Sequence, residues 1–153
     1  MKYRYIQQGL STYETEEQKP FVHYQVKSSE VNAAEKEIGQ AFPADLKEFW
    51  LDVGCGLILK QYPLRNDGMR MDPAYRILGP DEVVYLIKSD PERFEGVIPF
   101  LDLSDNGWLV ICDDGEIMFD DLEGTAVANS FNEFMVKLFD NARCLIDDAS
   151  LTP

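Results

Sequence analysis

The sequence predicts one α+β domain, built from a mostly antiparallel sheet with two N-terminal helices and one C-terminal helix. Its length of 153 residues is usual for a single domain, and an apolar fraction of 45% supplies a core. Helical periodicity occurs early and again at the end, while short strands separated by Asn-Gly and Asp-Gly turns lie between. Because no linker rich in Pro, Gly or Ser interrupts the chain, we expect residues 1–153 to form one domain.

The N-terminal third begins with two segments of alternating apolar and polar residues, at 3–6 and 21–26, which predict strands. Apolar side chains then recur every three or four positions, as on one face of an amphipathic helix. We expect this first helix at residues 29–40, with Gly39 at its end because helices often stop at a left-handed glycine.

A second helix is expected at residues 43–54, since Pro43 suits a first helical turn and Gly54 follows the last apolar position. Apolar residues at 57–62 predict a strand. Residues 63–75 contain Asn-Asp-Gly and Asp-Pro and are interpreted as a loop or hairpin turn. A third helix is expected to start at Pro80.

The middle of the chain predicts a meander of short strands at 97–103, 107–112, 116–119 and 125–128. A last amphipathic helix is expected at 130–146, where Ser130 would cap its N-terminus. The side chains expected in the core are Phe49, Trp50, Phe100, Ile111 and Phe134.

Negative charge is concentrated in one block of this chain, whose formal net charge is −14. Between Arg93 and Lys137 there is no Lys or Arg, and this block holds ten of the 28 acidic residues. Nucleic acid is excluded as a ligand because binding it requires cations that neutralise phosphates. A basic protein is a suitable partner, because opposite fields accelerate association. The alternative is an acidic face that only keeps the protein in solution.

Catalytic chemistry has little support in the sequence, so we expect no enzyme and no cofactor. The single histidine, His23, lies in an aromatic strand without an acid or nucleophile nearby. Cys55 follows a helix C-terminus, which disfavours a thiolate, and Cys112 and Cys144 lie in apolar runs typical of core positions. An odd number of cysteines, far apart and without a Cys-x-x-Cys motif, predicts a cytoplasmic protein, as does the lack of a readable signal peptide or membrane span.

One loop has the oxygen spacing of a calcium site. From Asp102 to Asp113, oxygen side chains stand at loop positions 1, 3, 5 and 12, with Gly107 at position 6. The flanks are strands rather than helices and position 12 is not Glu, so an acidic hairpin is preferred and no metal is expected. Asp102 and Asp113 with Trp108 could also form a glycoside-hydrolysing cleft, a minor alternative.

The order of these motifs resembles the SUKH superfamily, which includes bacterial immunity proteins and Smi/Knr-type cell-wall regulators. The most specific segment is Phe-Pro-Ala-Asp-Leu-Lys-Glu-Phe-Trp at 42–50, followed by Gly-Cys-Gly at 54–56. Further similarity lies in Ile-Pro-Phe at 98–100, Asp-Asn-Gly-Trp at 105–108 and Ser-Phe-Asn-Glu-Phe at 130–134. The resemblance covers residues 28–140.

The resemblance implies a binding protein without catalysis that neutralises a cognate toxin, often a nuclease, in the cell that makes it. The alternative is a non-catalytic regulatory or scaffold protein, of the cell-wall regulator type, that binds another basic partner. We expect the acidic turns to lie close together and to contact the partner, with Trp108 as an aromatic anchor if it is exposed. The predicted contact residues are Asp105, Trp108, Asp113, Asp114, Glu116, Asp120, Asp121 and Glu123.

Overall fold

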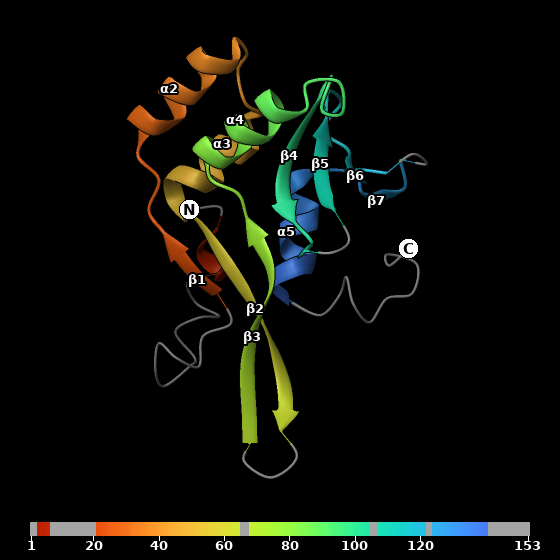
Figure 1. Ribbon diagram of the computed structural model, residues 1–153. Coiled ribbons are helices and arrows are strands. Elements are labelled where there is room, and N and C mark those ends of the chain that lie inside the picture. Colours follow the sequence, from red (N-terminus) through yellow and green to blue (C-terminus); the bar gives the residue numbers. More distant parts are fainter. Residues whose placement is uncertain (1–2, 7–20, 65–67, 105–106, 122–123, 141–153) are drawn as a thin grey trace.

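An antiparallel sheet of seven strands runs through the part of the molecule that the structure describes, and its spatial order β1 to β7 follows the chain (Figure 1). The structure is a computed structural model that describes residues 3–6, 21–64, 68–104, 107–121 and 124–140. The strands are β1 (Phe21–Tyr24), β2 (Cys55–Leu64), β3 (Gly68–Ile77), β4 (Val97–Asp102), β5 (Trp108–Cys112), β6 (Ile117–Phe119) and β7 (Ala126–Ala128). This arrangement confirms the predicted α+β class with a mostly antiparallel sheet.

Four labelled helices are inserted between these strands or follow them: α2 (Ser28–Ile38), α3 (Ala44–Asp52), α4 (Pro80–Ser89) and α5 (Phe131–Asp140). The predicted helix ends agree with the backbone. Gly39 ends α2 at a φ of 73°, and its N–H donates to the Glu35 carbonyl over 2.9 Å. Ser130 caps α5, since its Oγ accepts the Glu133 N–H at 3.1 Å. The part of the predicted last helix beyond residue 140 lies outside the described residues.

Two local predictions were wrong. Residues 4–6 are helical rather than extended, and Tyr3 and Ile6, three positions apart, are both buried. That spacing places both on one helical face, which a four-residue alternation does not distinguish from a strand. The Tyr3 hydroxyl fixes this turn by donating to Asn132 Oδ1 over 2.6 Å. The loop or hairpin turn expected at 63–75 is mostly strand, because β3 begins at Gly68 and pairs along β2, so only the short connection between the two strands agrees with it.

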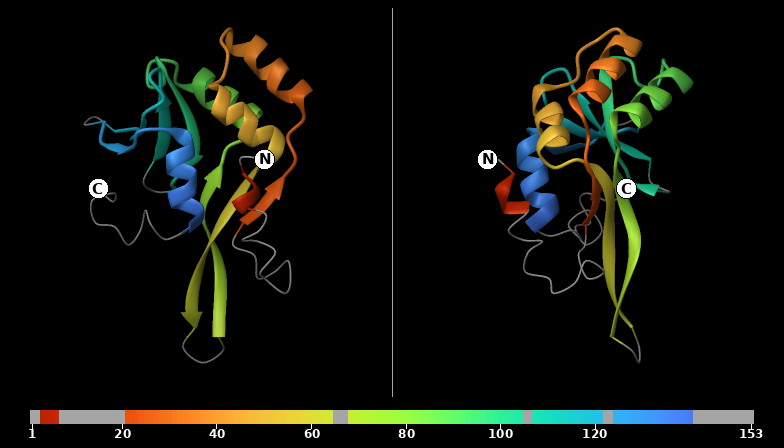
Figure 2. Two further views of the ribbon diagram at one scale, coloured as in Figure 1. Left: turned by 180° about the vertical axis from the view of Figure 1, so that it is seen from behind. Right: turned by 90° about the vertical axis from the view of Figure 1, so that its left-hand side faces the viewer.

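The outer parts of β2 and β3 form a two-stranded arm that extends from the body of the molecule (Figures 1 and 2). Strand β1 pairs with β2 only at residues 55–58, and β4 pairs with β3 only at Arg76 and Ile77. From Leu59↔Pro73 to Leu64↔Gly68, the two strands therefore pair with each other alone among the described residues.

One hydrophobic core joins the sheet to α3, α5 and the N-terminal helical turn, which lie on the same side of it (Figure 2). Trp50 is fully buried, and its indole N–H donates to the Leu78 carbonyl over 2.8 Å. The Phe100 ring makes edge-to-face contacts with Phe131 and Phe134 at centroid distances of 5.4 and 5.7 Å. All five side chains predicted for the core are buried: Phe49, Trp50, Phe100, Ile111 and Phe134.

The turn after α3 requires glycine for two reasons. Gly54 has a φ of 119°, which L side chains rarely adopt. A Cβ at this position would also collide with the Tyr24 carbonyl oxygen. This close approach lets β1 pair with the start of β2, where Tyr24 lies opposite Cys55.

Candidate functional site: an acidic rim beside a surface hollow

The acidic turns of the meander do not form one patch, contrary to the expectation that they all lie together. Successive turns of an antiparallel meander fall at alternate ends of the strands. The turn that carries Asp113 and Asp114 joins β5 to β6, whereas Asp120 and Asp121 follow β6 at its other end. The two groups are separated by the length of β6 and its flanks, on the order of 10 Å at ~3.3 Å per residue.

Hydrogen bonds within the β5–β6 turn hold its shape. Gly115 N–H donates to the Cys112 carbonyl, and Cys112 N–H donates to the Glu116 carbonyl, both over 2.9 Å. Asp114 Oδ1 accepts the Glu116 N–H at 3.0 Å. Asp113 and Asp114 are exposed and Glu116 is half-buried, so three carboxylates are held on a turn of defined geometry.

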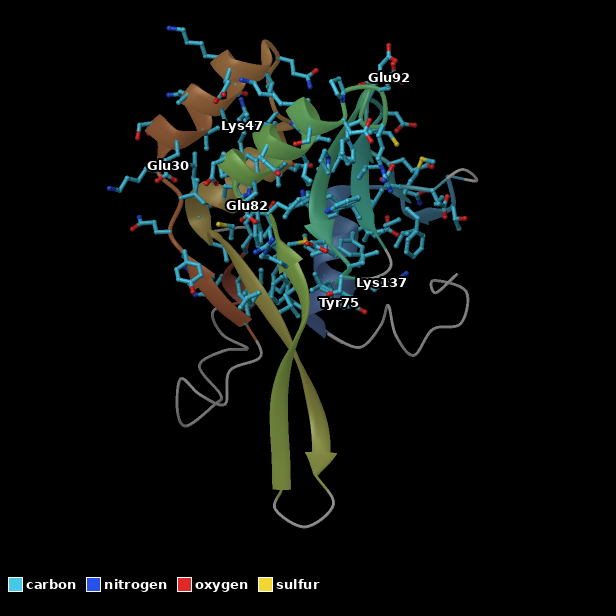
Figure 3. All side chains as sticks on the ribbon, in the orientation of Figure 1. Glu30, Lys47, Tyr75, Glu82, Glu92 and Lys137 are labelled. Carbon is cyan, nitrogen blue, oxygen red and sulfur yellow. The ribbon has the colours of Figure 1, made fainter. Side chains whose placement is uncertain are left out.

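A fourth carboxylate comes from the segment that precedes β4. Because Val97 lies opposite Cys112, the residues just before β4 reach the β5–β6 turn. Gly96 lines the same surface hollow as Asp113 and Gly115, its neighbour Glu95 is exposed, and Glu92 is exposed in the same turn of chain (Figure 3). We call Glu95, Asp113, Asp114 and Glu116 the acidic rim. None of these four pairs with a Lys or Arg within the described residues.

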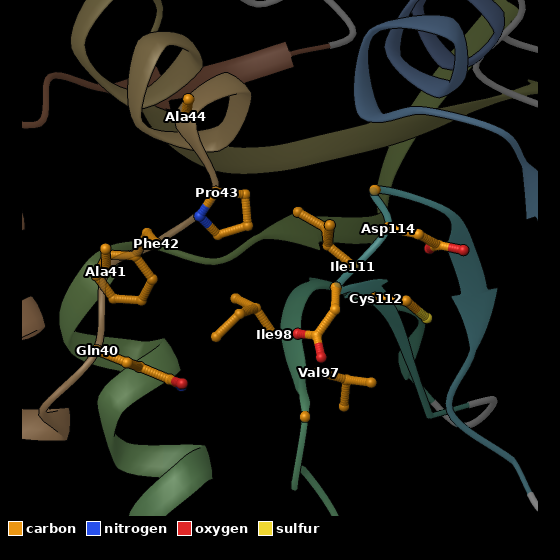
Figure 4. Close-up of a pocket in the computed structure, with 13 residues that line it drawn as sticks. Gln40, Ala41, Phe42, Pro43, Ala44, Val97, Ile98, Ile111, Cys112 and Asp114 are labelled. Atoms are coloured by element: carbon orange, nitrogen blue, oxygen red, sulfur yellow. The ribbon is translucent and has the colours of Figure 1, made fainter.

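The rim borders a hollow of about 410 Å³ between the α2–α3 connection and the β4–β5 strands (Figure 4). The α2–α3 connection contributes Phe42 and Pro43, and the strands contribute Ile98 and Ile111. Phe42 is held in place because its N–H donates to Glu35 Oε2 over 2.7 Å and its ring packs on Trp50. The hollow thus has an apolar floor and carboxylates along one edge.

The electrostatic effect of the rim extends to Cys112, which lines the hollow. The pKa of its thiol is raised, first by burial and then by the carboxylates of Asp114, Glu116 and Asp113. Cys112 is half-buried, with its Sγ 3.1 Å from Met118 Sδ, rather than fully in the core. A thiol held in its neutral form is a poor nucleophile.

In the second acidic group, Asp120 forms an ion pair within the protein. Arg93 Nε lies 2.6 Å from Asp120 Oδ2, and the Asp120 side chain is only 12% exposed. The Arg93 guanidinium also covers the Trp108 ring at 4.8 Å, while the Phe94 ring contacts Trp108 edge-on at 5.7 Å. Trp108 is half-buried, so the exposure required of an aromatic anchor is met only in part.

The other predicted contact residues divide between the described and undescribed parts of the chain. Asp121 is exposed, and its Oδ1 accepts the Gly124 N–H at 2.6 Å, which closes its own turn. Asp105 and Glu123 lie outside the described residues. Of the eight predicted residues, the structure brings Asp113, Asp114 and Glu116 together beside the hollow, and a contact role for any of them stays a prediction.

Neither a calcium site nor a glycoside-hydrolysing cleft built on Asp102 and Asp113 fits the strand geometry. Asp102 ends β4 and Asp113 follows β5, so they lie at opposite ends of the β4–β5 hairpin and cannot ligate one ion or flank one sugar bond. Asp102 Oδ1 instead accepts the Ser104 N–H at 2.8 Å. Within the described residues, no group of three or more His, Cys, Asp or Glu side chains could hold a metal.

His23 and Cys55 each contact neighbouring parts of the fold. His23 stacks on Phe21 at 5.0 Å, and its Nδ1 lies 3.0 Å from the Val53 carbonyl oxygen, so Nδ1 carries the proton. The Cys55 thiol is half-buried, and its pKa is raised to about 11, chiefly by burial. Both arrangements agree with the sequence interpretation. Cys144 lies outside the described residues.

Comparison with protein families gives a clear result. The sequence profile of the SMI1 / KNR4 family (SUKH-1) matches residues 25–137, which are 113 of the 153 residues. The chain belongs to this family. The match includes Phe42 and Pro43 at the hollow and the whole β4–β7 meander. A search of curated proteins found no match to the chain. No helix in the described part of the chain is long and apolar enough to span a membrane.

Sequence reasoning missed the hollow, although it had singled out its parts. The Phe-Pro pair at 42–43 and the Ile-Pro-Phe segment at 98–100 carried the family resemblance, but nothing in the sequence says that Phe42 and Ile98 line one cavity. A second omission concerns two tyrosines, one on β1 and one on α4. Tyr24 and Tyr85 are large side chains that point to solvent, and only the fold shows which face of each element is covered.

Proposed function

We propose that this protein is an immunity protein of the SUKH group, which binds and neutralises a basic protein toxin, in the first place a nuclease. The observation that carries this proposal is the acidic rim of four carboxylates without cationic partners among the described residues, beside a hollow with an apolar floor. Membership of the SMI1 / KNR4 family (SUKH-1) supports it.

The rim and the hollow would contribute differently to such a complex. A nuclease holds phosphates and therefore presents a basic cleft. Carboxylates on the rigid β5–β6 turn would occupy that cleft in place of phosphates and accelerate encounter. The apolar floor around Phe42 and Ile98 would take an apolar side chain of the toxin next to its cations, and buried contacts of this kind slow dissociation.

The direct test is protection of cells that express a toxin encoded beside this gene. Co-expression should restore growth, and the two proteins should elute together. The variant Asp113→Lys/Asp114→Lys should lose most protection. The control Asp52→Lys/Glu133→Lys changes the net charge equally at two exposed positions on α3 and α5 and should keep protection. Equal protection by both variants would place the interface elsewhere.

The regulatory alternative, a scaffold for another basic partner, predicts a different pattern. The protein would then give no protection against the neighbouring toxin and would not bind it. In that case, loss of its gene should alter cell-wall sensitivity instead. Growth of the gene deletion in the presence of a wall-active compound, with and without toxin expression, separates the two functions.

A further inference from the structure

A groove runs between α2 and α4, away from the acidic rim. It consists of two adjoining hollows of about 450 and 410 Å³, which share the lining residues Glu37, Asp81 and Val84. Figure 1 shows the two helices side by side at the end of the molecule opposite the β2–β3 arm. We call this feature the α2–α4 groove.

The floor of the groove is apolar. Val26, Ala34 and Val84 are buried along it, Ala33 is exposed on its α2 wall, and Cys55 also lines it. Because residues 33 and 34 are alanines, their short side chains leave room along this wall of α2. An aliphatic side chain of a ligand could therefore reach the floor between the helices.

Two exposed aromatic side chains border the groove. The structure describes four large apolar side chains that are exposed, and the two aromatic ones are Tyr24, at 62%, and Tyr85, at 71%. Tyr24 lines the first hollow and Tyr85 the second. Tyrosine is enriched among residues that dominate binding energy, because its ring buries a large area at low entropic cost.

The charge of the groove is negative. Three carboxylates, Glu30, Glu37 and Asp81, and one cation, Lys88, line its two hollows. Lys88 Nζ bridges the helices to Glu37 Oε1 over 2.6 Å, with both side chains about half exposed. Asp81 has no cationic partner in the part of the chain that is described. Figure 3 places Glu30 on α2 and Glu82 at the start of α4.

The field of these carboxylates reaches the floor of the groove. After burial, the largest causes of the raised Cys55 pKa, which is about 11, are the carboxylates of Glu82, Asp81 and Glu30, and only Arg76 opposes them. A cation bound near the thiol would therefore lie in a negative potential that is already present.

We propose that the α2–α4 groove is a second binding site, which accepts a short segment of another protein in which Lys or Arg side chains alternate with aliphatic ones. Aliphatic side chains would contact the floor between Tyr24 and Tyr85, and cations would pair with Glu30, Glu37 or Asp81. A second copy of this chain is a poor occupant, because two chains of net charge −14 repel each other. The inference does not depend on what binds the acidic rim.

The experiment titrates the ¹⁵N-labelled full chain with three capped peptides. They are Ac-Lys-Leu-Lys-Leu-Lys-NH₂, its charge-reversed form with Glu, and its polar form with Ser in place of Leu. The first should give saturable amide shifts at Ala33, Ala34 and Val84, and it should bind at least about tenfold more tightly than the other two, which each lack one kind of contact. The polar peptide controls for general attraction to an acidic protein.

Two variants test the walls of the groove. Tyr85→Ala, at the most exposed large apolar position described, and Asp81→Lys should each weaken binding of the Lys-Leu peptide by about tenfold. Leu51→Ala and Asp52→Lys, exposed on α3, are the matched controls and should change it less than about twofold. Amide shifts confined to residues 95–97 and 112–116, equal affinity for the polar peptide, or unchanged affinity in both groove variants would overturn the proposal. The peptides and groove variants are separate from the toxin assay, so either proposal can fail without the other.

Discussion

Reversing the charge of Asp113 and Asp114 should slow toxin association by an amount that depends strongly on salt. The two carboxylates are adjacent, exposed and unpaired with cations among the described residues. One unit charge at about 10 Å from one cation in water interacts by about 0.4 kcal/mol, so reversing two charges changes the encounter energy by about 1.7 kcal/mol. Screening reduces this to about 1.2 kcal/mol at 0.01 M salt and about 0.5 kcal/mol at 0.15 M.

These energies convert to rates that stopped-flow mixing can measure. The Asp113→Lys/Asp114→Lys variant should associate about eightfold more slowly than the natural sequence at 0.01 M salt and about twofold more slowly at 0.15 M. The Asp52→Lys/Glu133→Lys control should change the rate less at both salt concentrations, because its charges lie on α3 and α5. Circular dichroism establishes that each variant is folded. The reasoning is refuted if both variants slow association equally, since net charge rather than the rim would then control encounter.

Three further outcomes follow from the described contacts. Trp50→Phe removes a buried hydrogen bond of 2.8 Å and some core volume, and it should lower the free energy of unfolding by about 2–4 kcal/mol in urea titrations; a loss under 1 kcal/mol would contradict the packing. Arg93→Ala and Asp120→Ala should each destabilise the protein. A double-mutant cycle should give a coupling energy of about 1 kcal/mol or more, because the two charged groups are 2.6 Å apart and the Asp120 side chain is mostly covered. Additive effects of the two substitutions would rule the pair out as a stabilising contact. With the other two cysteines replaced by Ser, Cys55 should react with iodoacetamide at pH 8 on the order of a hundredfold more slowly than a free cysteine, because a pKa of about 11 leaves its thiol protonated. Asp81→Asn should lower that pKa and therefore speed the reaction. A slower reaction in Asp81→Asn would contradict the assigned cause of the raised pKa.

The sequence was most informative where local periodicity and burial agree. Periodicity predicted the helices α2 and α3 and the β4–β7 meander, because in each segment the spacing of apolar residues fits one kind of element. The five predicted core residues lie in such segments and are buried. Prediction failed at residues 3–6, which are too few to distinguish a helical turn from a strand. It failed again at β3, where Asn-Asp-Gly and Asp-Pro indicated a loop or hairpin turn, yet β2 and β3 are strands of ten residues that pair at nine positions. In that ribbon the pairing partner, rather than local composition, determines the structure.

The acidic block shows why the site was harder to predict than the fold. Asp113 and Asp120 look equivalent in the sequence, since each follows a short strand and precedes a second acid. The meander places them at opposite ends of β6, and the segment before β4 then brings Arg93 to Asp120 alone. One carboxylate consequently stabilises the packing over Trp108, while the other stays beside the hollow between the α2–α3 connection and the β4–β5 strands. Net charge therefore identified the kind of partner to consider. Which acidic residues are available to contact that partner depends on the end of the sheet that each turn occupies and on the position of Arg93, the only cation of the 91–96 segment.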